Sequence, residues 1–267
     1  GYSPESKKWE NFCKDFCKNH NIELTSTSIA KLDSAASLES SFRKARFKIF
    51  ANILRSPAIL ALAHHMNDQV ETILFRMFRG SGPEGISGIN EVNTLDGIKV
   101  LRPMLKIEKD EIYEYIEKHK LKFIHDHSNE DEQFDRNFIR NRLMPLIRKR
   151  WPAAIKKISD LSELSKKDIE FKNIFLEQRI EDFRSESGLD ILSLSKVSEN
   201  ERTYIIRHWI KESGFPQPNR KTQLEIEKIF FCSQTTSISS VQWKRADNEQ
   251  KSCKMTTDKK SLIIKEP

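Results

Sequence analysis

The strongest constraint on the fold of this chain is the junction between an apolar segment and an amphipathic helix within residues 58–80. Residues 58–63 read AILALA, an uninterrupted apolar run that is typical of a strand buried on both faces of a parallel sheet. The next residues predict a helix that begins near Asn67, a suitable N-cap, and ends at Gly80. Its inner face consists of apolar residues at helical spacing: Val70, Ile73, Leu74, Met77 and Phe78. A strand followed directly by a helix favours an α/β fold.

The same alternation continues on both sides of this junction. Helices are predicted at residues 38–54 and 108–119, and strands at residues 98–101 and 122–124. This order is typical of a doubly wound α/β domain with a parallel sheet. Ligands of such a domain bind beyond the carboxyl ends of the strands, where we expect the polar residues that follow the strands: His64, His65, Arg102 and Asp126.

The pattern changes after residue 135. Residues 153–187 contain neither Gly nor Pro and predict a long connecting helix. A smaller unit begins near Gly188, with further helices and then short strands. We therefore expect three parts: a catalytic domain at residues 1–150, a connecting helix at 151–187 and a mainly helical C-terminal domain at 188–267.

The net charge of +7 is divided between two basic regions. Residues 136–150 contain six basic and no acidic side chains, and residues 201–267 contain thirteen basic and eight acidic ones. Residues 151–200, between them, carry eight basic and ten acidic side chains. This division suits a polyanion that is held at two places, although solvated helix faces give similar counts.

Cysteine usage and hydropathy exclude two further classes of protein. Four cysteines are too few to build a disulfide scaffold for 267 residues. Cys13 and Cys17 share one helical face with three aromatic residues, so we expect them to fill the core as reduced thiols of a cytoplasmic protein. No apolar run approaches the roughly 20 residues that cross a bilayer, so we expect no membrane association.

Two carboxylates stand in the first turn of the predicted helix at 67–80. Asp68 and Glu71 follow the buried strand, at the end of the sheet where an α/β site lies. Two carboxylates there can hold an ammonium group or a magnesium ion, whereas a solvated helix face with paired charges is the plainer interpretation. His64 and His65 lack the H-E-x-x-H spacing of a helical zinc site, so we predict no protein-bound metal.

A second polar constellation lies in residues 124–151, where acidic residues precede a basic helix. Arg136, Asn137, Arg140 and Asn141 share one face of that helix. Guanidinium forks and amide donors suit phosphates and base edges, although capping acids followed by a solvated cationic helix give the same pattern. The nearby GSGPEG segment is not a P-loop, since it lacks the Lys-Ser or Lys-Thr ending and follows a helix instead of opening one.

Five segments together resemble one family. They are AHHMNDQVET at 63–72, RGSGPEGISGI at 79–89, LRPML at 101–105, the D-x-S-N of 126–129 and RNFIRNRLMP at 136–145. Their order and spacing are similar to those of the tRNA(Ile)-lysidine synthetases, which are N-type ATP pyrophosphatases, also called PP-loop proteins. LESSFRKARF at 38–47 and the region from about Leu189 also resemble that family, the latter more loosely.

The resemblance implies a PP-loop fold with appended tRNA-binding domains. It implies a reaction in which ATP, with Mg²⁺, adenylates the wobble cytidine of a tRNA(Ile) with a CAU anticodon, after which free L-lysine displaces AMP to give lysidine. It also assigns roles to residues of this sequence. Asp68, Glu71 and His64 would be catalytic, Arg43, Arg46, Arg79 and Arg102 would bind phosphates, and Arg136, Asn137 and Arg140 would bind tRNA.

Two departures from the family pattern keep a second interpretation open. Asn67-Asp68 stands where the family commonly has Asp-Asp. Of these two positions, only Asp68 can therefore take the role of a carboxylate. The family's S-G-G-x-D-S phosphate loop does not occur in this sequence, which would begin after the family's second strand. The alternative is a non-catalytic tRNA-binding protein with the same fold. A related tRNA thiolation enzyme would need reactive cysteines near the site, whereas Cys13 and Cys17 are expected in the core.

Overall fold

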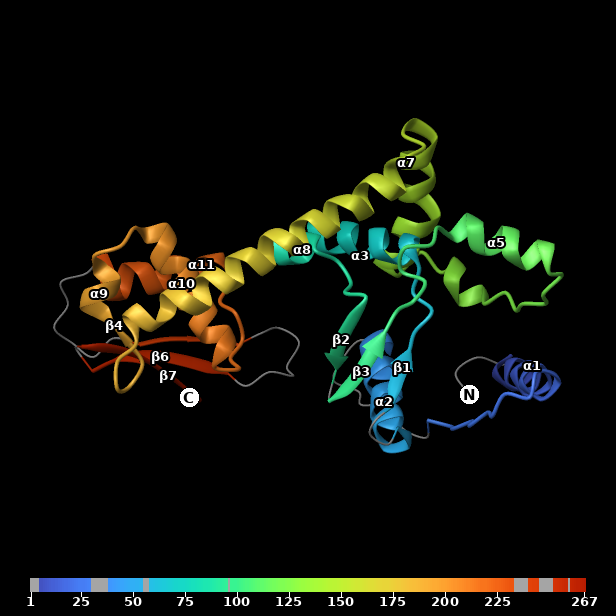
Figure 1. Cartoon of the computed structure of the whole chain (residues 1–267), viewed down its shortest axis with the longest axis horizontal. Coiled ribbons are helices and arrows are strands. Elements are labelled where there is room, and N and C mark those ends of the chain that lie inside the picture. The colour runs from blue at the N-terminus through green and yellow to red at the C-terminus, as the bar shows by residue number, and fades with distance from the viewer. Residues whose placement is uncertain are drawn as a thin grey trace. The chain divides into compact units, whose positions relative to one another are not determined.

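The computed structural model describes residues 5–29, 38–54, 58–95, 97–232, 240–244, 252–258 and 260–267, with the side chains of 38–40 left aside. The chain divides into two compact units, residues 1–166 and 167–267 (Figure 1). The boundary falls within the long helix α8 (Ala154–Arg179), which lies in the segment predicted to be a connecting helix. The predicted three-part division, with its limits at 150 and 187, stays a prediction.

The sheet of unit 1 has three strands in the order β1-β3-β2. β1 (Ile59–Ala61) pairs in parallel with β3 (Ile98–Leu101), and β2 (Val92–Leu95) pairs with β3 in the antiparallel sense. Both parallel strands were predicted, and the α/β fold class is confirmed. β2 was not predicted, and the strand predicted at 122–124 is wrong. Residues 121–126 form no regular structure, and their apolar side chains Leu121 and Phe123 are exposed because no described strand pairs with this segment.

One face of this sheet carries a hydrophobic core. Phe47 of α2 (Leu38–Ile53) packs against Ile98 and Val100 of β3, with Leu60 and Leu62 partly buried beside them. The prediction that residues 58–63 are buried on both faces is wrong: Ile59 is 52% exposed. Exposure alternates along β1, because every second side chain points to a face of the sheet that no described element covers.

Helix α3 (Met66–Phe78) is the centre of a second core in unit 1. Its residues Met66, Val70 and Leu74 pack against a helical segment made of α6 (Asp135–Phe138), the π-helix η2 (Ile139–Leu143) and α7 (Met144–Arg150), and against Ile155 of α8. Gly80 has a φ of 71° and ends the helix as predicted. The predicted N-cap is wrong, because His65 caps the helix, while buried Asn67 accepts a hydrogen bond from the Lys109 amide (3.0 Å).

Three shorter helices and the N-terminal helix complete unit 1. They are α1 (Ser6–Asn19), α4 (Pro83–Ile86), α5 (Lys109–Lys118) and the 3₁₀ turn η1 (His127–Glu130). α5 was predicted. The expectation that Cys13 and Cys17 fill the core is wrong: α1 has no buried residue, and Cys13 is exposed. The apolar residues of α1 do share one face of the helix, but no described element covers that face.

Unit 2 combines helices with an antiparallel sheet in the order β4-β7-β6-β5. The strands are β4 (Leu189–Asp190), β5 (Ser240–Trp243), β6 (Cys253–Thr257) and β7 (Ser261–Lys265). The helices are η3 (Ile180–Phe183), α9 (Ile191–Ser195), α10 (Glu199–Glu212), α11 (Arg220–Glu227) and the π-helix η4 (Lys228–Cys232). Its core contains Ile205, Ile226 and Leu262. Burial raises the pKa of the Cys253 thiol to about 12, so this cysteine is inert. In neither unit is a described helix long and apolar enough to span a bilayer.

Candidate active site

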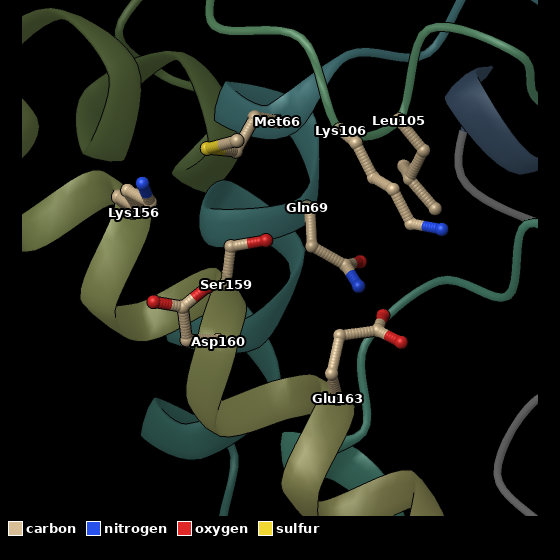
Figure 2. A pocket seen from close by; sticks show the side chains of 8 residues that line it. All are labelled: Met66, Gln69, Leu105, Lys106, Lys156, Ser159, Asp160 and Glu163. Atoms are coloured by element: carbon tan, nitrogen blue, oxygen red, sulfur yellow. The ribbon is translucent and has the colours of Figure 1, made fainter.

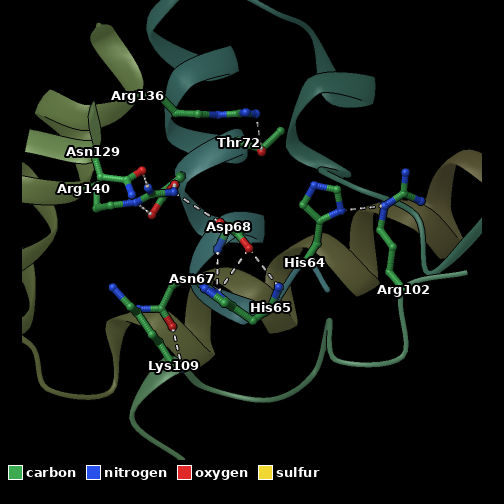
Figure 3. Close-up of polar contacts among 11 residues, drawn as sticks. His64, His65, Asn67, Asp68, Thr72, Arg102, Lys109, Asn129, Arg136 and Arg140 are labelled. Atoms are coloured by element: carbon green, nitrogen blue, oxygen red, sulfur yellow. Dashed lines mark hydrogen bonds and ion pairs between the residues drawn. The ribbon is translucent and has the colours of Figure 1, made fainter. Parts of the chain in front are cut away.

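Two of the predicted site residues, His64 and Arg102, come together where β1 and β3 end. Because the two strands are parallel, their carboxyl ends share one edge of the sheet, and His64 follows β1 as Arg102 follows β3. The Arg102 Nε donates a hydrogen bond to His64 Nδ1 at 3.2 Å (Figure 3). Arg102 is 3% exposed, and its Nη1 donates to the Asn90 carbonyl (2.8 Å) and to Asn93 Oδ1 (2.7 Å). β2 and the loop before it therefore hold this guanidinium in place.

Arg102 also determines which ring nitrogen of His64 carries the proton. Burial lowers the pKa of His64, and the positive charges of Arg102, Arg136 and Arg43 lower it further, against the opposing effect of Asp68. A neutral imidazole whose Nδ1 accepts a hydrogen bond carries its proton on Nε2. His64 is thus a neutral hydrogen-bond donor at pH 7.

Asp68 is fixed in the first turn of α3 by a capping box. Its Oδ2 accepts a hydrogen bond from the His65 backbone N–H at 2.9 Å, and His65 Nδ1 accepts one from the Asp68 N–H at 3.4 Å. Burial lowers the pKa of His65, against the opposing effect of the Asp68 carboxylate, so a neutral ring performs this capping. Asp68 keeps its other oxygen, Oδ1, for partners outside α3.

Glu71 is paired with Arg140, a residue expected to contact RNA. Arg140 donates from Nε to Glu71 Oε1 and from Nη2 to Oε2, both at 2.7 Å, and Nη2 also reaches Asp68 Oδ1 at 3.3 Å. Glu71 is 2% exposed, and its hydrogen bonds raise the pKa of Arg140. Two carboxylates and one guanidinium leave a formal charge of −1. Arg140 alone therefore does not neutralise both carboxylates.

The D-x-S-N motif and the basic helix are joined by amide side chains. Asn129 Oδ1 accepts a hydrogen bond from Arg140 Nη1 (3.2 Å), and Asn141 Nδ2 donates to the Asn129 carbonyl (2.8 Å). Asn137 Nδ2 donates to the Ser128 carbonyl (2.9 Å) and to the Asp131 carbonyl (2.8 Å). Asn129 belongs to the D-x-S-N motif, but no role was predicted for it. In the structure its side chain orients Arg140. Asn137 lies in the same region, where it fixes the loop.

The predicted phosphate-binding arginines divide into two groups. Arg46 and Arg79 are exposed, Arg79 stacks on the Phe75 ring at 5.0 Å, and neither forms a hydrogen bond or ion pair with the rest of the site among the described residues. Arg76, to which no role was assigned from the sequence, donates to the Gly88 carbonyl at 2.6 Å, and burial and then two neighbouring arginines lower its pKa. Its position one turn beyond Thr72, which accepts a hydrogen bond from Arg136 (3.2 Å), is the signal that could have identified it. The guanidinium groups that affect one another electrostatically are those of Arg43, Arg76, Arg102 and Arg136.

Gln69 also holds the Gly-rich loop against α3, beside the hydrogen bond from Arg76 to Gly88. Gln69 Nε2 donates to the Ile89 carbonyl at 3.1 Å, while Gln69 Oε1 accepts from the Ile89 N–H. Gly88 has a φ of 64°, and a Cβ on it would lie 2.5 Å from Gln69 Oε1. Both the backbone conformation and the close approach require glycine there.

A separate cavity of about 260 Å³ lies in unit 1 (Figure 2). Residues of α3, of the loop after β3 and of α8 line this cavity. None of these lining residues is a predicted site residue. The lining residues are Met66, Gln69, Leu105, Lys106, Lys156, Ser159, Asp160 and Glu163.

Comparison with known proteins shows the family of this chain. The PP-loop domain matches residues 1–147, more than half of the chain, and the chain therefore belongs to the PP-loop family. Curated relatives named tRNA(Ile)-lysidine synthase cover most of it. The protein from Wigglesworthia glossinidia brevipalpis is 35% identical over 238 residues, which are 89% of this chain and 60% of the relative. Those from Buchnera aphidicola subsp. Baizongia pistaciae and Escherichia coli O157:H7 are 36% and 30% identical, and each match covers 85% of this chain and 53% of the relative. The chain thus spans little more than half the length of these relatives.

Proposed function

We propose that this protein ligates lysine to the wobble cytidine of a tRNA(Ile) with a CAU anticodon, at the expense of ATP. The observation that carries the proposal is the division of charge at one sheet edge. Asp68, Glu71 and Arg140 together carry a formal charge of −1, and at the same edge the positive charge of Arg43 acts on both Arg76 and Arg102. A cationic amine and an anionic polyphosphate are the two small substrates that such a pair of neighbouring sites attracts. The names of the relatives support the particular reaction.

Arg43 and Arg102, with Arg76 beside them, would bind ATP. Burial and the charge of Arg43 lower the pKa of the Arg102 guanidinium. An anion bound between Arg43 and Arg102 would reduce the repulsion between their positive charges. His64, neutral and with its proton on Nε2, adds a hydrogen-bond donor to this group. The carbon-2 oxygen of cytidine would attack the α-phosphorus, and pyrophosphate would leave. Arg46 and Arg79 would join from the exposed surface.

Magnesium would enter as the counter-ion of ATP. The carboxylates do not fit the ion in the arrangement observed, because Arg140 binds both oxygens of Glu71 and one oxygen of Asp68. No step of the mechanism depends on a metal held by these residues.

The carboxylates would receive the lysine side chain. Asp68 is the more accessible of the two, with its side chain 20% exposed against 2% for Glu71. The ammonium must lose a proton before its nitrogen attacks carbon 2; that attack breaks the bond to the AMP oxygen, and a second proton leaves the nitrogen. Asp68 would orient the amine and accept the first proton.

Arg140 would connect RNA binding to lysine binding. It is drawn to Glu71 in this structure, yet it belongs to the basic segment expected to meet tRNA. A tRNA phosphate that attracts Arg140 would uncover Glu71, so both carboxylates would then face the ammonium. Arg136 and Asn137 would contact the RNA from the same segment. We expect a cytoplasmic location, where tRNA and free lysine meet.

The experiment is lysine incorporation. The full-length protein is incubated with ATP, radiolabelled lysine and tRNA(Ile) with a CAU anticodon, and labelled RNA is measured. A tRNA(Met) with the same anticodon is the control. Label on the isoleucine tRNA alone supports the proposal. Tight binding of tRNA without label, in the presence of all substrates, would instead establish the non-catalytic tRNA-binding alternative.

Binding of lysine tests the role of Arg140 separately. We expect lysine to bind at least about tenfold more tightly when tRNA is present. Arg140→Gln should remove that dependence, because no guanidinium then competes for Glu71. Equal lysine affinity with and without tRNA would contradict the exchange.

A further inference from the structure

A cluster of metal-binding side chains lies in the loop that follows α5, outside the candidate active site. His125, His127 and Glu130 each present a ligand atom, and these atoms all lie within 4.8 Å of one another. His125 Nε2 is 2.9 Å from Glu130 Oε1, and His127 Nδ1 is 3.6 Å from the same oxygen. All three side chains are exposed, so an ion can reach them from solvent.

The separations of the two imidazole nitrogens from Glu130 Oε1 fit a tetrahedral ion. A zinc ion with bonds of about 2.0–2.1 Å to nitrogen and oxygen places its ligand atoms about 3.4 Å apart. The two separations measured to Glu130 Oε1 lie on either side of that value. Rotation of exposed side chains within this range requires no movement of the backbone.

The backbone of the loop is already held in the required shape. Asp126 Oδ1 accepts a hydrogen bond from the Ser128 N–H (2.9 Å), and the Asn129 side chain donates to the Asp126 carbonyl (3.1 Å). Asn137 holds the carbonyls of Ser128 and Asp131. A site whose scaffold exists before the ion arrives loses less entropy on binding than a flexible loop does.

We propose that His125, His127 and Glu130 bind a divalent transition-metal ion of the Zn²⁺ class, with solvent at the fourth position. Two imidazoles and one carboxylate select this class, because Mg²⁺ and Ca²⁺ prefer oxygen ligands. The proposal of this site does not rest on the ligase reaction proposed above. The ion would tether the turn that carries Asn129, the residue that orients Arg140 at 3.2 Å.

The test counts tightly bound zinc ions per chain in the untagged protein by equilibrium dialysis and calorimetry. His127→Gln removes one ligand, and His119→Gln is the matched control, since His119 is also exposed and stacks on the Tyr115 ring instead. We expect His127→Gln to bind one zinc ion fewer than the wild type, or to bind it at least about 100-fold more weakly, and His119→Gln to match the wild type. Counting the difference separates this site from any zinc held by the exposed thiols.

Cobalt provides the second readout. Co²⁺ bound by three protein ligands and solvent in a tetrahedral site gives intense visible absorption, which should appear at one equivalent and disappear in His125→Gln. Glu130→Gln, which keeps both imidazoles, should weaken the binding without changing the circular dichroism of the protein. Equal zinc counts in the wild type and His127→Gln, or an equal loss in His119→Gln, would overturn the proposal.

Discussion

Replacing Glu71 by Gln removes the charge that holds Arg140 in the site. The two side chains share two hydrogen bonds of 2.7 Å, and Glu71 is 2% exposed, whereas the Arg140 side chain is 27% exposed. An amide of the same shape keeps one acceptor and turns an N–H₂ group toward the guanidinium. Breaking a buried ion pair from one side costs about 3–5 kcal/mol, because a charge is left without its partner.

Two features of the site reduce that magnitude. Asp68 Oδ1 remains 3.3 Å from Arg140 Nη2, and about a quarter of the Arg140 side chain is in contact with solvent. We therefore expect Glu71→Gln to lower the free energy of unfolding of unit 1 by about 2–3 kcal/mol. For a unit of this size that corresponds to a fall in Tm of roughly 5–10 °C.

The assay is urea and thermal unfolding followed by circular dichroism. Asp110→Asn is the matched control, because Asp110 also pairs with an arginine, Arg148, but the two side chains are 55% and 38% exposed. Exposed pairs contribute about 1 kcal/mol or less. A loss in Glu71→Gln no larger than that in Asp110→Asn would refute the reasoning that burial makes this pair important.

Two further predictions concern pH and backbone conformation. Burial and neighbouring arginines lower the pKa of His64 below its ordinary value of 6.5, so the unfolded chain binds its proton first as the pH falls. Stability contributed by this neutral ring is present above pH 6.5 and is lost below it, at up to about 1.4 kcal/mol per pH unit for each proton. Urea unfolding between pH 7 and pH 5 measures this loss. A His64→Asn variant whose free energy of unfolding falls with pH as steeply as that of the wild type would contradict it. Gly88→Ala should destabilise unit 1 by about 2 kcal/mol or more, because its φ is 64° and the new Cβ would meet Gln69 Oε1. Gly97→Ala, with a φ of 79° and open space, should cost only about 1 kcal/mol; equal Tm shifts in the two variants would show that the close approach is unimportant.

Local sequence patterns predicted the elements that position the site. The apolar run at 58–63 and the helix after it gave β1 and α3, and the parallel pairing of β1 with β3 then follows from the α/β class. This was enough to place His64 and Arg102 at one edge of the sheet. The pattern failed where burial depends on distant segments: Ile59 is apolar and yet exposed, because the outer face of β1 has no covering layer among the described residues.

The pairing of side chains within the site was not predictable from local spacing. Arg140 lies 69 residues from Glu71, and its guanidinium could have faced solvent or RNA equally well. Only the packing of η2 against α3 brings the two together. The N-cap was mistaken for a similar reason: Asn67 is a better cap by type, but the Lys109 amide takes its side-chain oxygen and His65 caps the helix instead.

Asp68→Asn shows whether the carboxylates at this sheet edge receive lysine. The variant and the Asp110→Asn control are incubated with tRNA(Ile) and ATP labelled at the α-phosphate, and adenylated RNA and lysine incorporation are measured in the same reaction. We predict that Asp68→Asn binds tRNA with near-normal affinity and accumulates adenylated RNA, but incorporates lysine at least about 100-fold more slowly. Lysine incorporation at the rate of the Asp110→Asn control would contradict the account.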